Sequence, residues 1–229
     1  MLQPYFYNNH IKNIISIFGS LFDQREIIDD FGQTIKIPLI YAPKEKFIGY
    51  YQDRPDMTTT QIDTILPRMG FELKGIKFAP ERHTNPLNRI QPHATDEKKF
   101  MYNRVPYDFD FTLYIATRKF EDSLKIVEQI LPTFTPEFNV TIKEHPEFNI
   151  TTDIPIVLNG TSFSIDYEGS FDNKRVISWE LDFLVRGHLY SYTRTQERIK
   201  SAVLNLSWVY DEESIGKTTI VEGNKPYEQ

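Results

Sequence analysis

The 229-residue sequence contains no cysteine and no long apolar run. The lack of cysteine excludes a domain stapled by disulfides, zinc–thiolate sites and catalysis by a cysteine nucleophile. No apolar stretch approaches the about 20 residues that a membrane-spanning helix needs. The first residues show no basic start followed by an apolar segment, so no secretory signal is expected. We therefore expect a protein that folds in the cytosol and has no membrane partner.

A surplus of basic residues is also missing. The chain carries 32 acidic residues against 26 basic ones, a formal net charge of −6. Proteins that bind nucleic acid through its phosphates usually show a basic surplus or a basic stripe. We therefore expect no specific nucleic-acid binding. An acidic subunit that lines a DNA passage would repel the duplex and let it slide, which we keep as a hypothesis.

Motifs for phosphate binding and for nucleophilic catalysis are absent as well. The sequence has no Walker A motif, no G-x-G-x-x-G and no G-x-S-x-G, and its histidines lack metal-ligand spacing. His83 and His93 share a polar stretch with Asp96 and Glu97, but such stretches collect these residue types by chance. No cofactor and no metal site are predicted.

Asp108 and Asp110 are the one pair of carboxylates that suggests chemistry. Two acids at this spacing can hold a divalent cation or exchange protons, so a metal-dependent enzyme is an alternative function. Both acids, however, project from the same side of a strand whose other side carries Phe109 and Phe111. A solvated face of a sheet explains the pair without any catalytic role.

The residues that are present predict an α+β fold. Aromatic residues are plentiful, and they are favoured both in strands and at interfaces. A strand alternates apolar and polar residues around Phe111, and a helix follows that Thr117 can cap and Pro132 ends. The apolar stripe of this helix consists of Phe120, Leu124, Val127 and Leu131, widened by Ile126 and Ile130. This stripe should face the sheet.

Further elements follow from the same periodicities. We expect a helix over residues 9–24, a hairpin of 25–28 and 34–41 that turns at Gly32, and a strand over 71–78 with a weak point at Gly75. Residues 53–60 and 81–99 should be polar loops. Strands are expected over 139–143, 154–158, 161–167, 174–185 and 188–192, with turns at Asn159-Gly160 and Arg186-Gly187. Residues 202–210 should form a last strand or an extended arm.

These elements are expected to form one domain over residues 1–211, an antiparallel or mixed sheet packed with a few helices. The polar residues 212–229 should form a flexible tail.

Five blocks in order along the chain carry a resemblance to a known family. They are Y-F-Y-N at Tyr5–Asn8, I-P-L-I-Y-A-P-K-E-K-F at Ile37–Phe47, T-I-L-P-R at Thr64–Arg68, the strand-to-helix region Thr117–Asn139, and S-W-E-L-D-F-L-V-R-G-H-L-Y at Ser178–Tyr190. In order and spacing they resemble the tail sheath stabiliser, also called the tail completion or tail terminator protein, of T4-like contractile-tailed bacteriophages.

The resemblance implies a structural protein of the virion without catalytic residues. It implies a ring-forming subunit, a hexamer, assembled in the host cytoplasm and placed at the head-proximal end of the tail. The implied partners are further copies of the chain, the tail sheath protein, the tail tube or tube-terminator protein, and the neck or head-completion proteins. A neck or connector subunit that bridges tail and portal is the alternative from the same class.

The polar and aromatic residues of these blocks and of the 81–99 loop are the candidates for intersubunit contacts. The predicted interface residues are Tyr5, Tyr7, Tyr41, Lys44, Lys46, Arg68, His83 and Arg89.

Overall fold

The computed structural model describes residues 5–29, 32–44, 46–47, 66–92, 99–145, 148–167, 175–195, 201–205 and 218–222. Its helices are α1 (His10–Ser20), α4 (Phe120–Ile130) and the 3₁₀ turns η1 (Pro80–Arg82) and η2 (Leu131–Phe134). Its strands are β1 (Glu26–Ile28), β2 (Thr34–Lys36), β3 (Leu39–Tyr41), β4 (Arg68–Phe78), β5 (Arg89–Ile90), β6 (Lys99–Tyr102), β7 (Val105–Thr117), β8 (Phe138–His145), β9 (Ile150–Tyr167), β10 (Arg175–Leu189), β11 (Arg194–Thr195), β12 (Ser201–Asn205) and β13 (Thr218–Glu222). None of the helices among these residues is long and apolar enough to span a bilayer.

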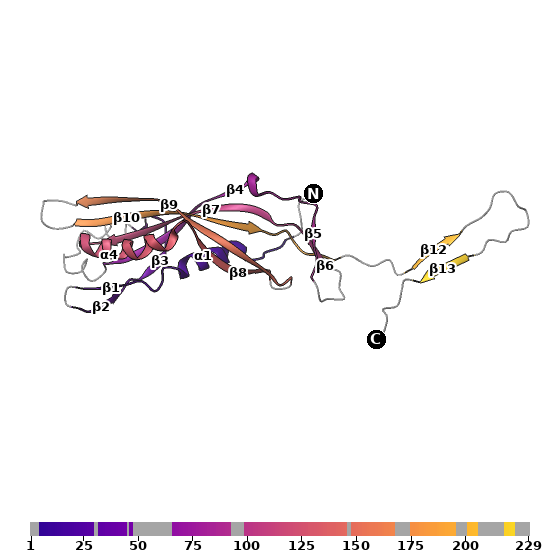
Figure 1. Cartoon of the computed structure of the whole chain (residues 1–229), viewed down its shortest axis with the longest axis horizontal. Coiled ribbons are helices and arrows are strands. Elements are labelled where there is room, and N and C mark those ends of the chain that lie inside the picture. Colours follow the sequence, from indigo (N-terminus) through magenta and orange to yellow (C-terminus); the bar gives the residue numbers. More distant parts are fainter. Residues whose placement is uncertain are drawn as a thin grey trace, which may run out of the picture.

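A six-stranded sheet forms the body of the molecule, in the order β3-β4-β7-β10-β9-β8 (Figure 1). Every pairing is antiparallel except the short parallel contact between β3 and β4. The central strands β7 and β10 pair without interruption from Val105 opposite Leu189 to Thr117 opposite Ile177. This mixed sheet with its helices confirms the predicted α+β class.

One face of the sheet carries the core. Alternate residues of β7, namely Phe109, Phe111, Leu113 and Ile115, are fully buried on that face. Both helices pack against them, and the ring of Phe18 in α1 stacks on Phe111 with centroids 4.4 Å apart. Alternation with period two places these residues on one side, so the strand pattern read from the sequence fixes which face is covered.

Helix α4 buries only part of the stripe that the sequence predicted: Ile126, Val127 and Ile130 are buried as expected. The buried residues are Ser123, Ile126, Val127 and Ile130, whereas Leu124 is 41% exposed. Phe120 and Leu131, also predicted to face the sheet, are exposed. Ser123 takes a buried place because its hydroxyl donates to the carbonyl of Phe120, which satisfies it within the helix. The prediction that Leu124 faces the core is therefore wrong.

The start of α4 also differs from the prediction. Lys119 is the N-cap residue and makes no capping hydrogen bond through its side chain. Thr117 is buried at the end of β7, and its hydroxyl donates to the carbonyl of Lys119 instead. Pro132 lies in η2, directly after the helix, as a residue without an N–H should.

Two predicted turns are strand interior. Asn159-Gly160 lies within β9, where the register against β10 shifts between Asp182 and Phe183, so the glycine marks an irregularity and not a hairpin. Arg186-Gly187 lies within β10. A Cβ at Gly187 would meet Phe109 at 2.9 Å and Ile14 at 3.0 Å, so this glycine permits close packing of α1 on the sheet.

The N-terminal elements follow the prediction more closely. Helix α1 lies within the expected range, and β1 pairs with β2 around Gly32, which has a positive φ of 75°. The expected second strand is split, because β2 ends before Pro38 and β3 joins β4 in the main sheet. Gly75 sits at a register shift of β4, as expected. The predicted loop at 53–60 lies outside the described residues.

The polar stretch 81–99 is partly ordered into η1, β5 and the start of β6. Strands β5, β6 and β11 form a separate three-stranded sheet. Within the segment expected as a flexible tail, residues 218–222 form β13, which pairs with β12. The placement of a domain boundary at residue 211 stays a prediction, and it would separate these two paired strands.

Candidate assembly surface

The predicted interface residues fall at two ends of the main sheet. Strand β4 runs from Arg68, opposite Ala116, to Phe78, opposite Tyr107. Four candidates lie toward the Arg68 end of this sheet: Tyr41, Lys44, Lys46 and Arg68 itself. The other four, Tyr5, Tyr7, His83 and Arg89, belong to segments near the opposite end, where β5 and β6 lie (Figure 1). The structure therefore does not bring the eight together into one surface.

At the end that carries β5, β6 and β11, aromatic and arginine side chains form a continuous series of contacts, which we call the aromatic–arginine surface. Its members are the exposed Phe6 and Arg89, the half-buried Tyr102, Tyr192 and Arg194, and the buried Phe100. The guanidinium of Arg194 lies 4.8 Å from the ring centroids of both Tyr102 and Tyr192. Arg89 lies 4.8 Å from the ring of Phe100, and Phe6 contacts Tyr192 at 6.1 Å.

This composition is typical of a protein contact surface. Tyr, Phe and Arg are enriched at interfaces and carry much of the binding energy there. On either side of Phe6 in the sequence, Tyr5 is 95% exposed and Tyr7 62%, so this segment presents three aromatic side chains to solvent. Asn8 anchors this segment by donating to the carbonyls of Tyr190 and Ser191. Of the predicted interface residues, Arg89 thus belongs to this surface, and Tyr5 and Tyr7 flank its member Phe6 in the sequence.

Tyr102, Tyr192 and Arg194 were missed at the level of sequence. The alternation of Phe100 with Tyr102 and of Tyr190 with Tyr192 was an available signal. It did not reveal that β11 would pair with β6 and bring the two segments side by side.

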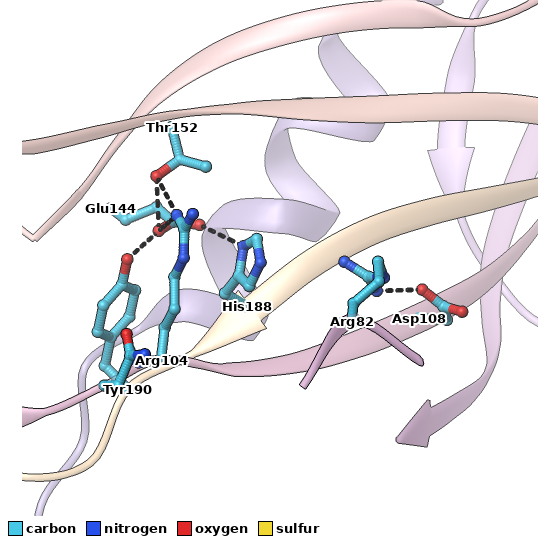
Figure 2. A network of polar contacts seen from close by, with 8 residues as sticks. Arg82, Arg104, Asp108, Glu144, Thr152, His188 and Tyr190 are labelled. Carbon is cyan, nitrogen blue, oxygen red and sulfur yellow. Dashed lines mark hydrogen bonds and ion pairs between the residues drawn. The ribbon is translucent and has the colours of Figure 1, made fainter. Parts of the chain in front are cut away.

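A buried polar network surrounds Glu144 and includes Tyr190, two residues before Tyr192 of this surface (Figure 2). The carboxylate of Glu144, in β8, accepts hydrogen bonds from the hydroxyl of Tyr190 and from that of Thr152 at 3.0 Å. Arg104 donates to Thr152 at 3.0 Å and lies 4.0 Å from Glu144, and His188 lies 3.7 Å away on the other carboxylate oxygen. The network ties β8, β9, β10 and the corner before β7 together at one point.

The electrostatics of the network favour an ionised Glu144. Burial alone would raise the pKa of this carboxyl, but the contacts with His188, Tyr190 and Thr152 outweigh burial and lower it. Burial and the adjacent carboxylate raise the pKa of the Tyr190 hydroxyl, so it stays a donor. His10, in α1, packs 5.2 Å from the Tyr190 ring, and burial lowers its pKa. A neutral His10 next to an ionised Glu144 is the stable arrangement at neutral pH.

The two acids considered for metal chemistry are each paired with a separate cation. Asp108 accepts from Arg82, the last residue of η1 (Figure 2), and Asp110 pairs with Lys77 at 2.7 Å. They are half-buried ion-paired groups and not the solvated acids that the sequence predicted. Among the described residues, no group of three His, Asp or Glu side chains is arranged to hold a metal ion. His93, Asp96 and Glu97 lie outside the described residues.

The remaining predicted residues have local partners. Lys44 pairs with Glu180 of β10, and Tyr41 packs edge-on against Phe71 at 5.2 Å while 54% exposed. His83 contacts the ring of Phe78 at 5.8 Å. Lys46 is exposed and Arg68 half-buried. Whether any of these residues touches another subunit stays a prediction.

Comparison with known proteins gives the class of this α+β chain. The model of the T4-like virus Myoviridae tail sheath stabiliser family matches residues 5–226, and the chain belongs to this family. It is 32% identical over 197 residues to the tail completion protein gp15 of Enterobacteria phage T4, a match that covers 81% of this chain and 72% of that protein. The chain is therefore a structural tail protein of a T4-like phage virion.

Proposed function

We propose that this chain caps the head-proximal end of a contractile tail as a closed ring of identical subunits, a hexamer. The ring holds the last layers of sheath and tube and offers a docking face to the neck and head. The family match over residues 5–226 is the observation that carries this proposal. The name of the relative in phage T4, a tail completion protein, supports it.

The aromatic–arginine surface supports a function in binding. Phe6, Tyr102 and Tyr192 present large, stiff side chains that bury much area at little cost in conformational entropy. In a closed ring, each contact is repeated by every subunit, so a modest contact becomes a stable cap through avidity.

No catalytic function is proposed. The salt bridges of Asp108 with Arg82 and of Asp110 with Lys77 neutralise these acids where they stand. Two carboxylates that face separate cations do not converge on a shared ion. A structural function for both acids therefore agrees with the structure better than metal-dependent chemistry does.

The proposal is tested with contractile tails assembled without this protein. Added protein should form rings that electron microscopy places at one end of the tail, the end that later joins heads. The double variant Phe6→Ala with Tyr7→Ala should cap fewer tails, whereas Ile28→Ala, which removes an exposed apolar side chain elsewhere, should cap as many as the unchanged protein. Rings bound along the portal side of isolated heads, with bare tail ends, would overturn the proposal in favour of a neck subunit.

A further inference from the structure

The outer strand β8 presents an open sheet edge. β8 pairs with β9 on one side, and among the described strands none pairs with its other side. Residues 138–143 run without a bulge, because the register shift falls between Lys143 and His145. The sequence F-N-V-T-I-K is rich in strand-forming residues and contains no proline. We call the outer side of residues 138–143 the β8 edge; it is a template for one more strand.

Strands β12 and β13 form a hairpin that is the counterpart of this edge. They pair with each other over five residues, from Ser201 opposite Glu222 to Asn205 opposite Thr218. Among the described strands they pair with no other, and Figure 1 draws the hairpin apart from the main sheet. A two-stranded sheet alone is marginally stable in water and needs a third strand or a packing surface. The hairpin would therefore be stabilised by pairing with the edge of another sheet.

The other edges of the described sheets are less suited to accept it. β1 is covered by α4, whose Lys125 and Gln129 donate to the carbonyls of Ile28 and Glu26 at 3.3 and 3.0 Å. The free part of β4 has a bulge at Gly75 and two exposed lysines, Lys74 and Lys77, which are the usual guards of a sheet edge. Strands β2, β3, β5 and β11 have three residues or fewer. The outer side of β9 beyond Ile156 also has no described partner, but a register irregularity at residue 159 interrupts that stretch, so the β8 edge is the regular open edge at the end of the strand order.

We propose that the β12–β13 hairpin of one copy of this chain adds to the β8 edge of a second copy. The strand lengths agree, five residues of hairpin against six of regular edge. The inference rests on the proposed ring, since the ring supplies the second copy. The donated hairpin gains the third strand it needs, and the β8 edge is covered.

This exchange also accounts for closure. The hairpin and the β8 edge are different surfaces of the same chain, so the contact is head-to-tail and every subunit both donates and accepts. Head-to-tail contacts close into a ring when the rotation between neighbours closes. A pair of identical β8 edges would instead give a two-fold dimer that stops at two copies.

The test uses full-length cysteine variants. Because the chain contains no cysteine of its own, each introduced thiol is the only reactive one at its site. Asn139→Cys places a thiol at an exposed position of the β8 edge, and Val203→Cys and Ile220→Cys place thiols at register partners in the hairpin. Lys143→Cys is a second acceptor position, and Glu128→Cys, exposed on α4, is the control. Acceptor and donor variants are mixed under conditions in which electron microscopy shows rings. The mixture is treated with a short bismaleimide, and the products are separated on a denaturing gel.

The expected yield of cross-linked heterodimer is at least about tenfold higher than the yield with the Glu128→Cys control, because apposed thiols react at a high effective concentration. The double variant Asn139→Cys with Ile220→Cys should give a ladder that stops at the ring's stoichiometry. A monomer cross-linked within itself would mean that the hairpin binds the β8 edge of its own chain, and this overturns the inference. Cross-links to a tail component alone overturn it as well. Rings without cross-links overturn the exchange but leave the capping function standing. Absence of rings, with and without tails, overturns both.

Discussion

Tyr190 donates its phenolic hydroxyl to the carboxylate of Glu144, and both residues are only 4% exposed. The contact joins the end of β10 to the edge strand β8 across β9, which lies between them in the sheet. Tyr190 lies two residues before Tyr192 of the aromatic–arginine surface, so the contact fixes the chain where it enters that surface.

Tyr190→Phe should lower the free energy of unfolding by about 1–3 kcal/mol, because it removes a donor from a buried carboxylate. Tyr41→Phe, at an exposed tyrosine, is the matched control and should change it by less than about 0.5 kcal/mol. Urea denaturation of both variants checks the prediction. Equal effects would show that the Tyr190 hydroxyl contributes nothing to stability.

Stability should fall in two steps as the pH is lowered. The pKa of His10 is lowered from 6.5, so the unfolded chain takes up a proton first, and stability falls as the pH drops below about 6.5. The pKa of Glu144 is lowered from 4.5, so its contribution is complete above that value and is lost as the pH falls through the folded pKa. Denaturation at a series of pH values checks both steps. His10→Phe should flatten the upper step and Glu144→Gln the lower one; an unchanged profile in either variant would contradict the assignment.

Gly187→Ala should destabilise the protein by about 1–3 kcal/mol, because the added methyl overpacks a filled site. The new Cβ would lie 2.9 Å from Phe109 and 3.0 Å from Ile14. Gly160→Ala has nothing within 4 Å of its Cβ and should be neutral or slightly stabilising. Thermal unfolding of the pair checks this contrast. A strongly destabilising Gly160→Ala would restore the turn that the sequence suggested there.

Ile126→Ala should cost about 2–5 kcal/mol, the usual loss for a large side chain removed from a core. Leu124→Ala should cost distinctly less, because Leu124 is 41% exposed whereas Ile126 is fully buried. The two residues lie on the same helix, so they share any effect of helix propensity. Chemical denaturation that ranked Leu124→Ala above Ile126→Ala would contradict the observed rotation of α4.

Asp108→Asn should destabilise the subunit more than Asp110→Asn does. Asp108 and its partner Arg82 have side chains only 19% and 25% exposed, whereas Lys77, the partner of Asp110, is 73% exposed. Loss of the first pair leaves a half-buried guanidinium with a weaker acceptor and should cost about 1–3 kcal/mol. Denaturation of the two single variants checks the order. If both prove silent, the Arg82 contact adds nothing to stability.

The sequence predicted those elements whose periodicity is read within one segment. The alternation around Phe111 gave the central strand, and the apolar spacing of α1 gave the first helix. Long strands that pair on both sides were harder, because Gly160 and Gly187 resemble turn residues when their neighbours are unknown. For Gly187, the deciding contacts are with Phe109 and Ile14, which are far away in the sequence, whereas Gly160 has no neighbour within 4 Å.

The candidate surface was predicted in part. Tyr5, Tyr7 and Arg89 were found through the family-like blocks and through the polar stretch. Tyr102, Tyr192 and Arg194 become neighbours only through the pairing of β6 with β11, a contact between residues more than 90 positions apart. The orientation of α4 was missed for a related reason: Ser123 is polar by type, yet its internal hydrogen bond allows it to be buried.

The contacts of α1 bear on how the nascent chain folds. Phe18 packs on Phe111 and Phe183, and Asn8 donates to the carbonyls of Tyr190 and Ser191, 182 and 183 positions later. The first helix can meet Phe71 and Phe111 earlier, but it cannot complete its contacts until the ribosome has released β10. Because such distant contacts must form late, folding should be slow and should begin after synthesis is nearly complete. A chain that stops before residue 190 lacks the carbonyls of Tyr190 and Ser191 that accept from Asn8.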